Sequence, residues 1–205
     1  MARRTKEDAA ATRDSILDAA EKLFVEQGVS RTTLQHIATA AGVTRGAIYW
    51  HFDDKSALFN AMMERVTLPF ECALSVLDTS DDANMLDDLR KFFVEIFRVT
   101  ETNPQARRVL EIASLKVEFV DEMEAVRVRR RQSKGELTAQ VVARVKLAQA
   151  RGQVREDIEP HMLATGLWAL MDGLIRSWMF ERGAFSLIET GDQLIGIMLE
   201  GVRTR

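Results

Sequence analysis

This 205-residue sequence contains one cysteine, three prolines and three histidines. The lone Cys72 excludes an internal disulfide and a thiolate metal cluster, fits a reducing cytoplasm, and is interpreted as a small buried hydrophobe. The few prolines leave long stretches free to form helices, and Val, Ile and Thr never alternate for long with polar residues as they do in strands. Helix-forming residues dominate instead, so the sequence predicts an all-α protein.

Long apolar runs are also missing. The basic amino terminus has no apolar segment after it, and the most apolar stretch, residues 163–180, is interrupted by Asp172 and Arg176. We therefore expect a soluble, cytoplasmic protein. No carboxylate pair lies near a base, no nucleophile lies beside a histidine and no phosphate-binding glycine loop is present, which argues against an enzyme. The histidines and Cys72 lack metal-ligand spacing, so neither a metal nor a cofactor is expected.

The charge balance limits how the protein could bind nucleic acid. The net charge is −3 and the isoelectric point is about 5.7, which argues against a general nucleic-acid coat. Residues 1–56 hold eight basic and eight acidic side chains. A nucleic-acid face in this region must therefore be a patch rather than a whole domain.

Helix stop and start signals divide the chain into two predicted domains. A first helix over residues 7–27 ends at Gly28, Thr32 or Thr33 caps a short second helix, and Thr44 caps a third that runs to Trp50. Longer helices are predicted over about residues 54–77, 85–101, 104–116, 121–151, 160–181 and 186–203. We expect a three-helix domain at residues 1–56 and a larger helical domain at residues 57–205.

The spacing of small residues between the second and third helices is typical of a helix-turn-helix unit. Ala38 lets the second helix of such a unit cross closely, and Gly42, four residues later, turns the chain with positive φ. Val43 and Ile48 then occupy positions that need apolar side chains to pack on Ile37.

The side chains between these core positions suit a DNA groove. Arg45 and Tyr49 lie one turn apart, Gly46 lets the backbone come close to a partner, and His51 and Lys55 follow. Arginine can bond to guanine, and hydroxyl, imidazole and ammonium groups suit phosphate oxygens. The alternatives are that Arg45 and Lys55 are solvated charges, that Tyr49 and the adjacent tryptophan pack on the next helix, and that the threonine before Arg45 is only a cap.

The stretch TTLQHIATAAGVTRGAIYWHFDDKSALFNAM resembles the DNA-binding module of the TetR family of repressors. The core GVTRGAIYWHF is similar to the AcrR-like branch, which represses multidrug efflux pumps. The likeness is specific over about residues 10–65 and extends in patches, LKVEFVDEM and MDGLIRSW, towards the carboxy terminus.

The resemblance implies an all-helical homodimer that binds operator DNA and whose carboxy-terminal domain binds a small hydrophobic or aromatic effector. It also implies a flexible basic arm at Arg3 and Arg4 that reaches the minor groove. The residues that it places at DNA-contacting positions are Thr33, Thr44, Arg45, Gly46, Tyr49, His51 and Lys55.

The helix predicted from residue 160 is apolar nearly all round and must be covered on two sides. Its own domain can cover one side, and a second subunit can cover the other by forming a four-helix bundle with the last helix. The alternative is one large monomeric core. The residues expected at the dimer interface are Leu163, Leu167, Leu170, Leu174, Trp178, Leu194, Ile195, Met198 and Val202.

Asp172 and Arg176 form an acid-base pair at i and i+4 within this apolar helix. They either pair with each other or give a ligand its few polar contacts in an apolar cavity, as the resemblance implies. The residues expected to line the cavity are Phe92, Phe93, Ile96, Leu110, Ser114, Phe119, Trp168, Asp172, Ile175 and Arg176. A rival reading of the whole chain is a helical enzyme or scaffold that uses its three-helix unit for protein contacts.

Overall fold

The computed structural model describes residues 6–75, 84–117 and 124–204, with the side chains of Lys6 and of residues 69–75 excepted. Within these ranges the chain forms helices and no strand, apart from an isolated bridge between Val154 and Arg203. The all-α prediction is confirmed. No helix in the described ranges is long and apolar enough to cross a membrane.

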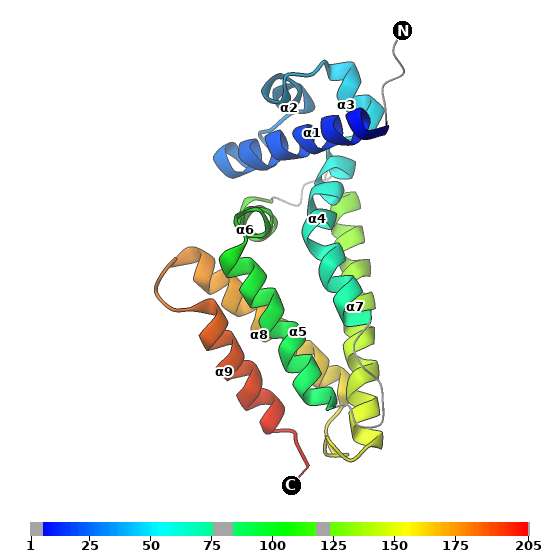
Figure 1. Cartoon of the computed structure of the whole chain (residues 1–205), viewed down its shortest axis with the longest axis vertical. Coiled ribbons are helices and arrows are strands. Elements are labelled where there is room, and N and C mark those ends of the chain that lie inside the picture. The colour runs from blue at the N-terminus through cyan, green and yellow to red at the C-terminus, as the bar shows by residue number, and fades with distance from the viewer. Residues whose placement is uncertain (1–5, 76–83, 118–123, 205) are drawn as a thin grey trace. The chain divides into compact units, whose positions relative to one another are not determined.

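Figure 1 shows the helices, coloured in chain order. They are α1 (Lys6–Gln27), α2 (Leu34–Ala41), α3 (Arg45–His51), α4 (Lys55–Ser75), α5 (Met85–Thr102), α6 (Pro104–Glu111), η1 (Ile112–Lys116), α7 (Glu124–Ala150), α8 (Pro160–Phe180) and α9 (Leu187–Glu200). The predicted helix over residues 104–116 is therefore an α-helix followed by the π-helical turn η1. The predicted end of the fourth helix near residue 77, and the predicted start of another at residue 121, lie outside the described residues.

The described chain forms two compact units. Unit 1 contains residues 1–66 and 108–130, and unit 2 contains residues 67–107 and 131–205. Unit 1 therefore includes the start of α4 and the η1 segment in addition to the three short helices. The predicted domain boundary between residues 56 and 57 stays a prediction.

Unit 1 is built around the apolar faces of α1, α2 and α4. Phe24 of α1 and Phe59 of α4 are fully buried, with ring centroids 6.2 Å apart. Ile37 of α2 and Ile48 of α3 are also fully buried, as the helix-turn-helix spacing predicts. Burying each of these side chains stabilises the fold by about 2 kcal/mol. Gly42 has φ of 67° at the turn between α2 and α3, which confirms its predicted role.

An ionic cluster holds α4 against α1. Arg65 donates hydrogen bonds of 2.7 Å to Asp14 and Asp18 and lies 3.2 Å from the carboxylate of Glu21. Glu21 is 1% exposed, and its other oxygen lies 3.6 Å from Arg108. Burial lowers the pKa of Arg65, but its hydrogen bonds to Asp14 and Asp18 outweigh that effect and raise the pKa. Because an unpaired buried carboxylate is costly, the cluster fixes these two helices in one arrangement.

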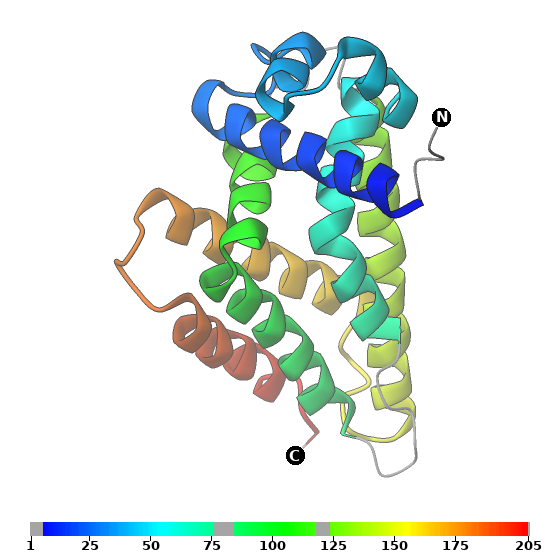
Figure 2. The ribbon, with the colours of Figure 1, turned by 45° about the horizontal axis from the view of Figure 1, so that its top comes forward.

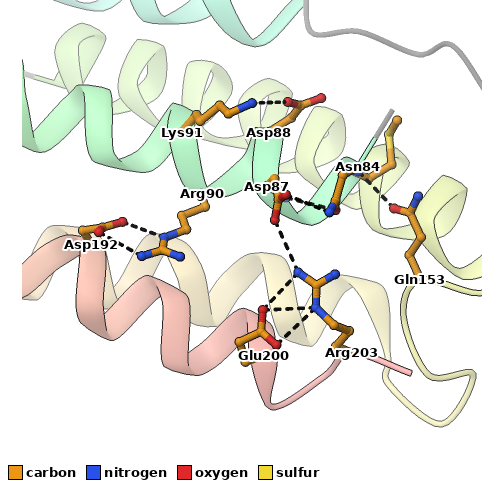
Figure 3. Close-up of polar contacts among 10 residues, drawn as sticks. Asn84, Asp87, Asp88, Arg90, Lys91, Gln153, Asp192, Glu200 and Arg203 are labelled. Atoms are coloured by element: carbon orange, nitrogen blue, oxygen red, sulfur yellow. Dashed lines mark hydrogen bonds and ion pairs between the residues drawn. The ribbon is translucent and has the colours of Figure 1, made fainter. Parts of the chain in front are cut away.

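Unit 2 packs α5, α8 and α9 against one another (Figures 1 and 2). Arg90 of α5 donates hydrogen bonds of 2.6 and 2.8 Å to Asp192 of α9, and these bonds raise the pKa of Arg90 (Figure 3). Near this pair, a Cβ atom built on Gly191 would lie 2.3 Å from the ring of Phe97. The side of α9 that carries Gly191 and Asp192 is therefore occupied by α5.

Candidate functional site

Two threonines fix where α2 and α3 begin. The hydroxyl of Thr33 accepts a hydrogen bond of 3.2 Å from the N–H of His36, and the imidazole of His36 accepts one from the N–H of Thr33. The hydroxyl of Thr44 accepts a bond of 3.2 Å from the N–H of Ala47. Each hydroxyl uses a lone pair for its cap, so its O–H remains available to donate to a phosphate. Both threonines are exposed, which is compatible with the predicted DNA contacts.

Arg45 and Tyr49 form a pair on the exposed side of α3. The guanidinium donates a hydrogen bond of 3.1 Å to the Tyr49 hydroxyl, and its carbon lies 5.4 Å from the centre of the Tyr49 ring. The hydrogen bond with Tyr49 raises the pKa of Arg45. Contact with Tyr49 limits the conformations of the Arg45 side chain while leaving it in solvent. An arginine held in this way is suited to bidentate bonding with a guanine edge.

Gly46 and His51 complete the predicted set on α3. Gly46 is exposed, and the atom closest to a Cβ built on it would be the Thr44 hydroxyl at 3.9 Å, so its backbone is open to an approaching partner. His51 is half-buried, and its ring packs edge-on against Trp50 with centroids 4.6 Å apart. On the exposed surface of α3 the structure places Thr44, Arg45, Gly46 and Tyr49, while His51 is half-buried at the last residue of the helix.

Trp50 is the residue of this surface that the sequence prediction missed. Its side chain is 72% exposed, so the alternative in which it packs on the next helix is wrong. An exposed tryptophan is uncommon on a monomer surface and marks an interaction site when it lies beside other exposed groups. The signal in the sequence is its position directly after Tyr49, but helical spacing does not show that both aromatic rings stay outside.

Lys55 does not lie on this surface. It is 5% exposed, and its ammonium donates hydrogen bonds of 3.1 Å to the carbonyls of Val29 and Thr32. This placement contradicts the predicted phosphate contact, because the ammonium is directed into unit 1. The start of α4 is occupied as well, since the Asp54 carboxylate accepts a bond of 2.7 Å from the N–H of Ala57. The predicted arm residues, Arg3 and Arg4, lie outside the described residues.

The predicted effector-binding residues belong to both units. In unit 2, Phe92, Phe93 and Trp168 pack edge-to-face, with Trp168 centroids 6.1 and 5.1 Å from the two phenyl rings, and Ile96 and Ile175 are also buried. Leu110 and Ser114 belong to unit 1 and are half-buried, and Phe119 lies outside the described residues. That all of them line one cavity stays a prediction.

Of the two alternatives for Asp172 and Arg176, an ion pair with each other within α8 is replaced by a contact between helices. Asp172 accepts a hydrogen bond of 2.8 Å from Lys134 of α7, and both side chains are more than half exposed. Arg176 is exposed. The spacing of four residues was a poor guide because a lysine on a neighbouring helix is also within reach of Asp172.

The predicted dimer residues divide by burial. Leu163, Leu167, Trp178 and Ile195 are at most 6% exposed within one chain, so they have almost no surface left to bury against a partner, and their assignment to the interface is wrong. The others are half-buried: Leu170, Leu174, Leu194, Met198 and Val202. The reason is that α5 and α9 of the same chain already cover one side of α8.

Comparison with known sequences identifies both parts of the chain. Residues 16–62 match bacterial regulatory proteins of the tetR family, and residues 84–203 match the carboxy-terminal region of MAATS-type transcriptional repressors. The HTH-type transcriptional regulator TtgR of Pseudomonas putida is 34% identical over 99% of this chain and 97% of its own length. The HTH-type transcriptional repressor BepR of Brucella suis biovar 1 is 34% identical over 98% and 96%.

Solved structures agree with these matches. NalD, the secondary repressor of the MexAB-OprM multidrug efflux pump in Pseudomonas aeruginosa, has a TM-score of 0.88 and 33% identity over 96% of this chain and 98% of its own. A complex of SmeT with triclosan has a TM-score of 0.83 and 32% identity over 95% and 92%. SmeT is the repressor of the multidrug efflux pump SmeDEF of Stenotrophomonas maltophilia.

These matches cover the capped helix-turn-helix and the helical unit that follows it. The relatives are transcriptional regulators, so the alternatives of an enzyme and of a protein-docking scaffold are set aside. The resemblance seen in the sequence is confirmed over nearly the whole length, and the chain belongs to the TetR family of bacterial transcriptional regulators.

Proposed function

We propose that this regulator is a homodimeric repressor of efflux-pump genes that a small hydrophobic effector releases from its operator. The observation that carries the proposal is the exposed surface of α3, where Arg45 and Tyr49 are paired between the capping Thr44 and the exposed Trp50. Thr33 at the start of α2 and His51 at the end of α3 extend it. Operator DNA is the partner that this mixture of guanidinium, hydroxyl and aromatic groups fits best.

The choice of target genes and effector class rests on the relatives. NalD and SmeT repress multidrug efflux pumps, and SmeT has been solved with triclosan, an aromatic phenol. By this likeness the chain controls efflux genes and responds to apolar aromatic compounds. A cytoplasmic location, where operator DNA is found, remains a prediction.

The aromatic cluster of unit 2 supports an aromatic effector. The indole N–H of Trp168 is buried and has no hydrogen-bond partner among the described residues, and its ring lies against Phe92 and Phe93. A buried donor without a partner costs free energy, which a ligand oxygen would recover. Trp168 would thus provide a polar contact in an otherwise apolar environment, and Ile96 and Ile175 would contribute apolar surface.

A second copy of the chain is the proposed cover for the outer face of α8 and α9. Met162, Ala169, Gly173 and Phe180 are exposed and recur at spacings of seven, four and seven residues, so they share one face of α8. Ile197 of α9 is 69% exposed. Homodimers are typical of this family, and a two-fold axis would present two α3 helices to major grooves about 34 to 36 Å apart.

The first test is fluorescence anisotropy on labelled DNA from upstream of the regulator's own gene, with random DNA as the reference. Tight binding to the first DNA at about 0.15 M salt, abolished by triclosan, is expected. Arg45→Ala should weaken operator binding by about 5- to 150-fold without shifting the thermal midpoint. If Arg45→Ala instead unfolds the protein, Arg45 is structural and the proposed recognition surface is wrong.

The effector site is tested separately with Trp168→Phe, which keeps an aromatic ring and removes the N–H. The variant should bind operator DNA normally but need about fivefold more triclosan for release, because one net hydrogen bond is lost. Unchanged sensitivity to triclosan would show that Trp168 does not contact the effector. Gly135→Ala, at an exposed position of α7 in the same unit, is the matched control.

A further inference from the structure

Lys55 is one of the few charged side chains buried in the described chain. Its ammonium donates hydrogen bonds of 3.1 Å to Val29 and to Thr32, which lie 26 and 23 residues before it. Both acceptors are main-chain carbonyls of the turn between α1 and α2, residues 28–33. The first residue of α4 is thereby connected to the segment that leads into the helix-turn-helix.

The 28–33 turn determines where α2 begins. Thr32 is fully buried, and its hydroxyl donates a bond of 2.8 Å to the carbonyl of Gly28 and accepts one of 3.0 Å from Gln27. The next residue, Thr33, is the cap of α2. Because α2 packs on α3, a shift of this turn would shift the exposed surface of α3 with it.

Helix stability alone does not favour a lysine at residue 55. The start of a helix carries partial positive charge, so a cation at the first residue of α4 is unfavourable there. An apolar residue of the same length could fill the space, but it would leave two buried carbonyls without these donors. The lysine is therefore explained by the two carbonyls that it binds.

The same turn is held from a second direction. The N–H of Val29 donates a hydrogen bond of 3.2 Å to the carbonyl of Lys116, the last residue of η1. A cleft of about 490 Å³ opens beside this bond, lined by residues 26–31 and 115–117. Val29 is thus bonded through its N–H to η1 and through its carbonyl to α4.

We propose that Lys55 is a positioning residue for operator binding, which holds the 28–33 turn and so sets α2 and α3 in the arrangement that fits the operator, without touching DNA itself. This role differs from a phosphate contact in two measurable ways. Loss of a phosphate contact weakens binding to all DNA sequences alike and lowers the salt dependence of the binding constant. Loss of positioning weakens operator binding selectively and leaves the salt dependence unchanged.

The experiment compares Lys55→Met with Lys22→Met, which removes the same charge from an exposed position on α1. Binding to an operator selected by the unmodified protein from random DNA, and to random DNA itself, is measured by anisotropy at four salt concentrations. Circular dichroism sets a temperature at which both variants are folded. We expect Lys55→Met to weaken operator binding about tenfold or more, to leave random-DNA binding within about twofold, and to keep the parent's salt slope.

Three results would overturn the proposal. A salt slope lower by about 0.9, with equal losses on both DNAs, would make Lys55 a phosphate contact. Unchanged operator binding by folded Lys55→Met would mean that the two hydrogen bonds serve stability only. A loss of operator affinity no greater than that of Lys22→Met would mean that the effect comes only from the change in net charge.

The unmodified protein provides a test that does not depend on the variant folding. Lysines are acetylated with a water-soluble ester, with and without operator, and each site is quantified by mass spectrometry. Lys55 should remain unmodified in both states under conditions that fully modify Lys22. A Lys55 that reacts in the free protein and is protected by the operator would instead be a DNA contact.

Discussion

The exposed faces of α3 and of α8–α9 differ in the side chains that they present to a partner. On α3 the exposed aromatic rings of Tyr49 and Trp50 stand beside Thr44 and Arg45, and the guanidinium is hydrogen-bonded to the tyrosine. On α8 the exposed stripe has Met162 and Phe180 at its ends, the small Ala169 and Gly173 between them, and the charged Arg176 at its edge.

This difference indicates two kinds of partner. A surface of fixed donors fits a polyanion, whose phosphates and base edges need hydrogen bonds in set positions. A surface of large apolar ends with small residues between them fits another helix, which can approach closely and bury the ends. Binding at the α3 surface would therefore depend on side-chain geometry, and binding at the α8–α9 surface would depend on the apolar area that is buried.

The strongest way to break this comparison is to place a charge on the apolar face. Ile197→Glu should raise the dimer dissociation constant by at least about 100-fold, because a two-fold interface would bury the new carboxylate twice. Sedimentation velocity measures it, and operator affinity should fall in parallel. Val128→Glu, at an exposed apolar position on α7, is the control, and an intact Ile197→Glu dimer would place the interface elsewhere.

The next test weakens the ionic support beneath the DNA-binding helices. Arg65→Met removes four hydrogen bonds to α1 and leaves the buried Glu21 with only part of its compensation. The free energy of unfolding should fall by about 3 kcal/mol in urea titrations. A loss below about 1 kcal/mol would show that Arg108 and solvent compensate Glu21 without Arg65.

The third test addresses packing in unit 2. Gly191→Ala should lower the free energy of unfolding by about 2 kcal/mol, because the added methyl would meet the buried ring of Phe97. Gly135→Ala, with open space around it, should instead stabilise α7 by up to about 1 kcal/mol. If both variants were stabilised, Phe97 would have room to move and α5 would not be tightly packed on α9.

The smallest expected effect concerns the start of α8. Glu159 accepts hydrogen bonds from the N–H groups of His161 and Met162, and these lower the pKa of Glu159. A lowered folded-state pKa gives stability that is present above the unfolded value, about 4.5, and lost as the pH falls through the folded value. Glu159→Gln should therefore melt a degree or two below the parent at pH 7. That difference should shrink as the pH falls below about 4.5, and a constant difference would point to lost helix capping alone.

Local signals made much of unit 1 predictable. Thr33 and Thr44 cap their helices, and Gly28 and Gly42 stop theirs with positive φ, because each of these roles is decided by neighbours within about four residues. Lys55 could not be placed in this way, since its acceptors lie more than twenty residues away and the sequence does not show that it is buried.

Unit 2 was harder to predict because α8 is apolar nearly all round. The pattern shows that two sides are covered, but it does not show which side belongs to the same chain. It therefore predicts partner contacts for Leu163 and Leu167, which are buried within one chain, and none for Met162 and Phe180, which are exposed. The contact of Asp172 with Lys134, 38 residues away, is not predictable either, because the sequence pattern does not show which helix packs beside α8.

The π-helical turn η1 gives the bond between Lys116 and Val29 a particular consequence. A π-turn holds one residue more than an α-turn, so rewinding η1 into an α-helix would advance its last residue by about 100° and 1.5 Å. The carbonyl of Lys116 would then turn away from the N–H of Val29, and the 28–33 turn would lose this bond while keeping those from Lys55. Because the change shifts η1 by one whole residue, it would displace the 28–33 turn, and the DNA-binding helices after it, by a discrete step rather than gradually.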